Sequence, residues 1–336
     1  MIRKIIIEGF KCFHKRQSIP LSQINILYGK NGRGKSTIAQ SFLLLAQTMK
    51  ECNDVAELRL MGDLIELGTF DEVINVNAKS GKFYWAFQDD DNLVEFGFEK
   101  FPHKTQMAKL CKLLVNNENR FDVKTTSDKG TVSENKSVST TSDIMMLQNF
   151  KLLQYVSAGR LGPKNYSARK DSLEDNWLGV KGEDVINVLT NQGPSFQEKV
   201  CEVLSEILTG ATLEARPKDS DSVELFLDSV NNGNKFRPIN VGFGYSYVLP
   251  VIVAALLAKK GSILIVENPE AHLHPGAQSR LTKFLIENSM INNIQLIIET
   301  HSDHVVNGLR IAMKQELSGL APNNAEIIFF SHDDVD

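Results

Sequence analysis

The stretch that decides the fold is Gly29-Lys30-Asn31-Gly32-Arg33-Gly34-Lys35-Ser36-Thr37. It fits G-x-x-x-x-G-K-[ST], a pattern that surrounds nucleotide phosphates when it lies between a strand and a helix. Residues 24–28 before it are apolar and β-prone, and residues 36–47 after it carry apolar side chains at helical spacing. The sequence therefore predicts a strand, a phosphate loop and a helix, in that order.

The chemistry of nucleotide binding explains the residue types in this loop. Glycines let backbone N–H groups turn inward around phosphate oxygens, and the start of the following helix adds partial positive charge. We expect Lys35 to reach the β- and γ-phosphates and the Ser36 hydroxyl to bind Mg²⁺. The predicted ATP-binding residues of the loop are Gly29, Asn31, Gly32, Gly34, Lys35, Ser36 and Thr37.

The overall composition is that of a globular protein without a strong charge bias. The chain has 336 residues and a net charge of −4, enough for one large domain or two modest ones and no general attraction to nucleic acid. Basic residues gather near the N-terminus, where a solvated face is the simplest interpretation. The four cysteines are widely spaced and predict reduced thiols in a cytoplasmic protein: Cys12, Cys52, Cys111 and Cys201.

No segment predicts a leader peptide or a membrane span. Residues 1–10 alternate like a strand, and the apolar residues 248–258 are too few to cross a bilayer and contain Pro250, so we expect a buried helix there. We therefore expect no membrane partner. Residues 116–143 are polar and predict a long mobile loop.

The spacing of apolar residues predicts an α/β fold. Residues 82–87 and 92–98 predict one hairpin, and residues 223–227 and 236–241 a second. Residues 195–208 predict a helix with a capping box formed by Ser195 and Glu198. From Tyr245 onward, helices alternate with strands at 263–266, 294–298 and 327–330, which predicts a parallel sheet covered by helices.

Two further motifs follow apolar strands in this last part of the chain. The first strand ends in Glu267-Asn268-Pro269-Glu270-Ala271-His272-Leu273-His274-Pro275, and the next ends in Thr300-His301-Ser302. A carboxylate at the tip of a buried strand beside a phosphate loop is the usual second ligand of Mg²⁺. The alternatives are that Glu267 and Glu270 cap a helix after Pro269 and that His301 only ends its strand.

Together, these motifs resemble the ATPase head of the ABC superfamily, in its RecF, SMC and OLD-like branch. The similarity covers nearly the whole chain and is greatest to stand-alone predicted AAA ATPases that accompany bacterial anti-phage genes. It implies a P-loop NTPase with a mixed or parallel core sheet, an antiparallel β subdomain and a helical lobe. The implied divisions are an N-terminal lobe at 1–160, a helical signature lobe at 161–245 and the rest of the nucleotide core at 246–336.

The resemblance also assigns roles to residues. It implies that Glu267 binds Mg²⁺ with Ser36, that His301 contacts the γ-phosphate, and that Lys35 is catalytic. Asn268 stands where most members carry the glutamate that activates water, so Glu270 becomes the candidate general base, or hydrolysis is slow.

ABC heads bind ATP between two copies, through a signature loop of the partner. This chain has no Leu-Ser-Gly-Gly-Gln string, but Val241-Gly242-Phe243-Gly244-Tyr245-Ser246 precedes the apolar helix at the expected place. The resemblance assigns ATP contacts to Gly242, Gly244, Ser246 and the interface residue His274. Arg160, in Tyr155-Val156-Ser157-Ala158-Gly159-Arg160, either contacts phosphate or forms an ordinary ion pair.

These features lead to three hypotheses. The first is an ATP- and Mg²⁺-dependent switch that forms a homodimer or higher oligomer and controls a separate effector protein, as in anti-phage defence. The second is a scaffold that assembles with ATP but hydrolyses little. The third is a RecF-like protein that binds DNA.

Overall fold

The computed structural model describes residues 1–119, 145–173 and 177–331, which form two compact units. Unit 1 comprises the described residues of Met1–Ser22, Gly29–Leu153 and Ile328–Asp336. Unit 2 comprises those of Gln23–Tyr28 and Gln154–Ile327. The three-part division expected from the sequence stays a prediction.

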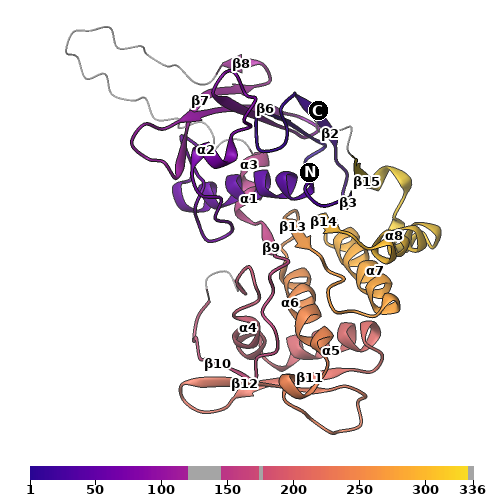
Figure 1. The fold of residues 1–336 in the computed structure, drawn as a ribbon. Helices are drawn as coiled ribbons and strands as arrows, with labels where there is room; N and C mark the ends of the chain where they lie inside the picture. Colours follow the sequence, from indigo (N-terminus) through magenta and orange to yellow (C-terminus); the bar gives the residue numbers. More distant parts are fainter. Residues whose placement is uncertain (120–144, 174–176, 332–336) are drawn as a thin grey trace. The chain divides into compact units, whose positions relative to one another are not determined.

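Unit 1 is built on an antiparallel sheet (Figure 1). Its buried core is rich in aromatic rings. Phe42 of α1 (Lys35–Cys52) meets Phe87 of the sheet edge to face at 5.2 Å between ring centroids, and it also contacts Phe150 of α3 (Met145–Lys151). These ring contacts hold the helix that follows the phosphate loop against the sheet. The strand order is β2 (Gln17–Pro20), β1 (Lys4–Glu8), β5 (Lys82–Gln88), β6 (Leu93–Lys100), β7 (Met107–Val115) and β4 (Glu57–Arg59), with β8 (Glu118–Asn119) on β7.

Several predictions for unit 1 can be compared with this sheet. The hairpin of β5 and β6 is confirmed, with Lys82 opposite Glu99 and Gln88 opposite Leu93. Residues 70–73 form a short helix, α2 (Phe70–Val73), that Thr69 and Glu72 cap reciprocally. The predicted polar loop at 116–143 lies mostly outside the described residues, and its first residues include β8.

The parallel sheet that the alternating pattern predicts belongs mainly to unit 2; only Gly29 and residues 328–330 of its strands are counted with unit 1. β3 (Ile24–Gly29), β14 (Gln295–Thr300), β13 (Ile263–Glu267) and β9 (Gln154–Val156) are parallel neighbours in that order, and β15 (Ala325–Phe330) follows β3 at the edge. Between these strands run α6 (Phe243–Leu257), α7 (Pro275–Ile291) and α8 (Asp303–Lys314). Their buried aliphatic side chains share one core with the sheet.

A smaller antiparallel sheet and two helices complete the fold of unit 2 (Figure 1). The strands are β10 (Tyr166–Ala168), β12 (Ser222–Asp228) and β11 (Thr212–Pro217), and the helices are α4 (Val185–Gln192) and α5 (Pro194–Ile207). The described part of unit 2 also has short 3₁₀ turns at η2 (Pro238–Asn240), η3 (Leu317–Gly319) and η4 (Pro322–Asn324).

Two local predictions for unit 2 are wrong. α5 begins at Pro194 with Gly193 as its N-cap, because proline is favoured in the first turn, so Ser195 does not cap the helix. The expected strand at 236–241 makes a single bridge, Phe236 to Leu227, and then turns into η2. Pro238 has no N–H to donate and cannot extend a ladder at that position.

The apolar segment at 248–258 lies within α6, as expected. Its residues from Val248 to Ala255 are buried, including Pro250 inside the helix. Within the described residues, no helix combines the length and hydrophobicity needed to cross a membrane.

We predict that Glu95 stabilises unit 1 in a pH-dependent way. Burial of its carboxylate opposes ionisation, but hydrogen bonds from Lys112 and from Arg16 (2.8 Å) outweigh it and lower the pKa of Glu95. A lowered folded pKa means that this stability is present above the ordinary value of 4.5 and is lost as the pH falls below it. Glu95→Gln should cost about 2 kcal/mol at pH 7 in urea unfolding, and less at pH 4.

The matched control is Glu99→Gln, which removes a more exposed pair with Lys82 at 2.9 Å. It should cost less than about 1 kcal/mol. Equal losses for the two variants would contradict a special role for Glu95.

Candidate functional site

The phosphate loop, residues 29–37, lies in unit 1 and adopts the backbone shape that glycine permits. Gly29, Gly32 and Gly34 have φ values of 137°, 72° and 103°. Gly34 is the N-cap of α1 and offers no side-chain cap to the first amides of the helix. These N–H groups are therefore of the kind that helix N-termini present to anions.

Lys35 places its charge inside this loop. The side chain is 3% exposed, and its ammonium donates to the carbonyl oxygens of Gly29 at 2.8 Å and Lys30 at 2.6 Å. Thr37 is buried, with its hydroxyl 3.6 Å from the sulfur of Cys12, whereas Asn31 is exposed. Ser36 lies in the first turn of α1, between Lys35 and Thr37.

The loop is packed tightly against other parts of unit 1. A Cβ atom at Gly34 would lie 2.8 Å from the ring of Phe13 and 3.1 Å from the sulfur of Cys12. A Cβ at Gly29 would lie 2.5 Å from the carbonyl oxygen of Phe330. Glycine is thus required at both positions by space as well as by φ.

The second group of predicted residues lies in unit 2, where parallel strands end side by side. Glu267 of β13 is in register with Glu299 of β14. Oε2 of Glu267 accepts a hydrogen bond from the amide of Ala158 at 3.1 Å, and Tyr155 of β9 also hydrogen-bonds to this carboxylate. Burial, and then the Glu267 charge, raise the pKa of the Tyr155 hydroxyl well above its usual range.

Residues 267–270, which we call the acidic turn, reverse the chain after β13. Asn268 has a left-handed backbone, with φ at 43°. Its backbone N–H donates to the backbone carbonyl of Glu299 at 2.8 Å. Oε1 of Glu270 accepts from the backbone amide of His301 at 3.0 Å, and its Oε2 is buried without a hydrogen-bond partner. The turn and the end of β14 are thus fixed to each other.

The helix-cap alternative for the two glutamates is wrong. α7 begins at Pro275, and its N-cap is His274, whose Nδ1 accepts from the amide of Gly276 at 3.3 Å. Glu270 is instead bonded to His301, an exposed residue one position before Ser302, the N-cap of α8.

Arg160 is the residue whose role the sequence left most open. It is 3% exposed, and its guanidinium donates to the carbonyl oxygens of Ser157 (2.9 Å), Glu267 (2.7 Å) and Asn268 (2.5 Å). Burial lowers the pKa of Arg160 to about 10, so it remains charged at neutral pH. Neither option offered by the sequence, phosphate contact or ion pair, describes these backbone bonds.

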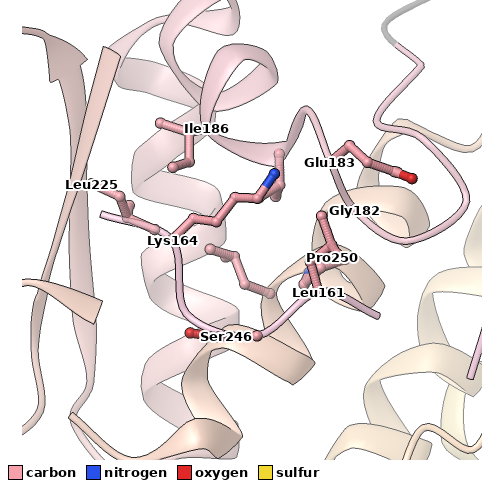
Figure 2. A pocket seen from close by; sticks show the side chains of 11 residues that line it. Leu161, Lys164, Gly182, Glu183, Ile186, Leu225, Ser246 and Pro250 are labelled. Atoms are coloured by element: carbon pink, nitrogen blue, oxygen red, sulfur yellow. The ribbon is translucent and has the colours of Figure 1, made fainter. Parts of the chain in front are cut away.

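The signature-like segment surrounds the start of α6. Gly242 is the N-cap, and a Cβ at Gly244 would lie 2.8 Å from the carbonyl oxygen of His272, so close packing also explains this glycine. Ser246 lines a largely apolar pocket with Leu161 and Pro250, which Lys164 also borders (Figure 2). The ATP contacts expected of Gly242, Gly244, Ser246 and His274 stay predictions.

The structure therefore groups the predicted residues by unit. The phosphate loop with Lys35 and Ser36 belongs to unit 1, and its chain leaves the carboxyl end of β3. Glu267, Glu270 and His301 are gathered at the carboxyl ends of β13 and β14 in unit 2. Sequence reasoning missed the hydrogen bond of Tyr155 to Glu267, although it had singled out the segment that carries both Tyr155 and Arg160.

Fold and loop together define an ATPase head of the P-loop class. The chain is similar in fold to the Smc head bound to the C-terminal winged-helix domain of ScpA, at 17% identity over 91% of each chain and a TM-score of 0.55. A second similar structure is the Smc head with an extended coiled coil bound to the C-terminal domain of ScpA derived from Pyrococcus furiosus, at 14% identity, 91% of each chain and a TM-score of 0.54.

The family follows from the sequence match. Residues 24–307 match the family described as "AAA domain, putative AbiEii toxin, Type IV TA system", and the chain belongs to this family. None of the curated proteins matches it. The ABC-type head fold and the ATPase resemblance predicted from the sequence are thus confirmed.

The packing around the phosphate loop leads to a prediction about stability. Gly34→Ala places alanine at a positive φ, with its Cβ against the Phe13 ring. Gly32→Ala also places alanine at a positive φ, but its Cβ points into open space. Gly34→Ala should therefore lower the thermal midpoint of unfolding by several degrees more than Gly32→Ala, measured by differential scanning fluorimetry without nucleotide. Equal midpoints would show that the Phe13 contact does not restrict the loop.

Proposed function

We propose that this protein is an Mg²⁺-dependent ATPase that acts as a switch, in which two copies close around ATP and their state controls a separate effector protein. The observation that carries the proposal is the placement of Glu270. One oxygen of its carboxylate is fixed by the amide of His301 and the other is buried without a partner. A carboxylate that is anchored through one oxygen keeps its second oxygen uncommitted, as a general base needs once water enters the site with the nucleotide.

The phosphate loop supplies the binding half of this proposal. Its left-handed glycines and the uncapped start of α1 favour an anion, and the ammonium of Lys35 adds a fixed positive charge. Ser36 and Glu267 offer a hydroxyl and a carboxylate, the hard oxygen ligands that suit Mg²⁺. When bound, Mg²⁺ neutralises charge on the β- and γ-phosphates.

Hydrolysis then needs a base and a group that stabilises negative charge. Glu270 removes a proton from the attacking water, which forms a bond to the γ-phosphorus as the bond to the leaving oxygen breaks. His301, next to it at the end of β14, stabilises the charge that develops on the γ-phosphate. The side-chain amide of Asn268 cannot accept a proton, so Glu270 must act as the base from a position two residues beyond the usual one. This displacement favours slow turnover.

Turnover of ATP with Glu270→Gln tests the proposed base. We expect slow phosphate release by the wild type and a loss of at least about a hundredfold in kcat for Glu270→Gln, with ATP affinity nearly unchanged. Glu287→Gln on the exposed side of α7 is the matched control and should behave as the wild type. Lys35→Ala reports contaminating ATPase activity.

Two outcomes would contradict this proposal in different ways. Tight ATP binding without turnover in the wild type would favour the assembly scaffold, which the amide at Asn268 also supports. Full activity of Glu270→Gln would remove Glu270 as the base while leaving the ATPase itself in place.

A separate measurement of molar mass tests whether two copies of the chain close around ATP. We expect Glu270→Gln with ATP and Mg²⁺ to double in molar mass in light scattering, because bound ATP persists when it is not hydrolysed. Lys35→Ala should stay at the mass seen without nucleotide. An unchanged mass for Glu270→Gln at saturating ATP would contradict assembly through the nucleotide.

A further inference from the structure

The end of β9 is tied to the acidic turn by one buried side chain. Arg160 reaches the carbonyl oxygens of Glu267 and Asn268, the residues that carry the backbone from β13 into the turn. A third bond, to the carbonyl of Ser157, fixes the guanidinium to its own loop. The planar group therefore bridges two segments that are more than 100 residues apart in the sequence.

The backbone that Arg160 holds has a left-handed conformation at Asn268. Asn268 has φ at 43°, a region that only a few per cent of residues other than glycine adopt. Its carbonyl accepts from Arg160 at 2.5 Å and from the amide of Ala271 at 3.1 Å. Two donors on one carbonyl oppose relaxation of the turn.

The same two segments concentrate buried polar atoms that lack partners. Four buried side-chain atoms in these segments have no hydrogen-bond partner among the described residues: Ser157 Oγ, Arg160 Nε, Asn268 Oδ1 and Glu270 Oε2. Buried polar atoms of this kind are satisfied in folded proteins by other groups, by water or by a bound ion, or they serve in catalysis. The contact of Arg160 with the turn therefore lies where polar groups are gathered at the ends of the parallel strands.

Charges and rings face Arg160 from every segment packed on it. Glu270 and Glu267 act on its charge from the acidic turn, Tyr155 from β9 and Tyr247 from α6, whose ring centre lies 5.9 Å from the guanidinium carbon. The positive charge thus lies beside both carboxylates of the proposed site. Its hydrogen bonds nevertheless go to backbone carbonyls, so it orients the turn instead of neutralising one carboxylate.

We propose that Arg160 is a positioning residue for ATP hydrolysis, which holds the acidic turn so that Glu267 and Glu270 keep the orientation that the reaction needs, and that it does not bind phosphate. This inference rests on the proposed function. Lysine cannot replace arginine here, because an ammonium group cannot reach three carbonyls with the fixed geometry of a planar guanidinium.

The experiment compares Arg160→Lys with Arg280→Lys. Arg280 is a matched control, since its guanidinium also bonds to a backbone carbonyl, that of Ile207, at 2.7 and 3.0 Å, but joins α7 to α5. For Arg160→Lys we expect kcat to fall about ten- to a hundredfold, with the Kd for a fluorescent ATP analogue within about twofold of the wild type. Arg280→Lys should keep both values.

Hydrogen–deuterium exchange of the full chain without nucleotide provides a readout that does not depend on turnover. Arg160→Lys should exchange faster in the peptide that covers residues 267–273, while Arg280→Lys leaves that peptide unchanged. If the wild type hydrolyses no ATP, the ATPase proposal fails, whereas faster exchange in this peptide would still support the role of Arg160 in holding the turn.

Three results would overturn the inference. A large rise in the Kd for the analogue with unchanged kcat would make Arg160 a phosphate ligand. A lower thermal midpoint with unchanged kcat would make it a structural residue only. Unchanged exchange at residues 267–273 would show that other bonds hold the turn.

Discussion

The parallel register of β9, β13 and β14 is the constraint on which the candidate site of unit 2 depends. Because parallel strands end at one edge, residues far apart in the chain are brought together there: Tyr155 lies in the short strand β9, Glu267 ends β13 and His301 follows β14. A shift of one residue would turn the Glu267 carboxylate to the other face of the sheet. β13 and β14 are buried along nearly their whole length, so both faces of these strands pack within the core and the polar ends of the strands lie at its edge.

Much of this arrangement could be predicted from local patterns. The phosphate loop, the apolar strands before Glu267 and Thr300, and the hairpin of β5 and β6 depend on residues close together in the sequence, so periodicity and glycine spacing were sufficient. The extent of β9 was harder to predict, because three residues carry too little periodicity. The hydrogen-bond partners of Arg160 could not be predicted either. They are backbone carbonyls, which every residue has, so the residue types at those positions give no signal.

Asn268 illustrates how backbone conformation and chemistry compete at one position. In the sequence, the side-chain amide of Asn268 departs from the glutamate that the resemblance leads us to expect at this position. The structure adds a conformational reason, since φ at 43° suits asparagine, which adopts left-handed conformations more readily than glutamate. The demand for a tight turn after β13 therefore favours asparagine here, and any base must come from a neighbour that the turn brings to the same edge.

Glu270 is that neighbour, and its hydrogen bond explains how a carboxylate two residues further on can be held at the edge. The amide of His301 belongs to the end of β14, so the position of Glu270 is set by the adjacent strand as well as by its own turn. The phosphate loop has no comparable dependence, because the ammonium of Lys35 bonds to carbonyls of its own loop. Nucleotide binding thus rests on local geometry, whereas hydrolysis rests on bonds between segments distant in sequence. Substitutions in the acidic turn or its supports should for this reason affect turnover before they affect affinity for ATP.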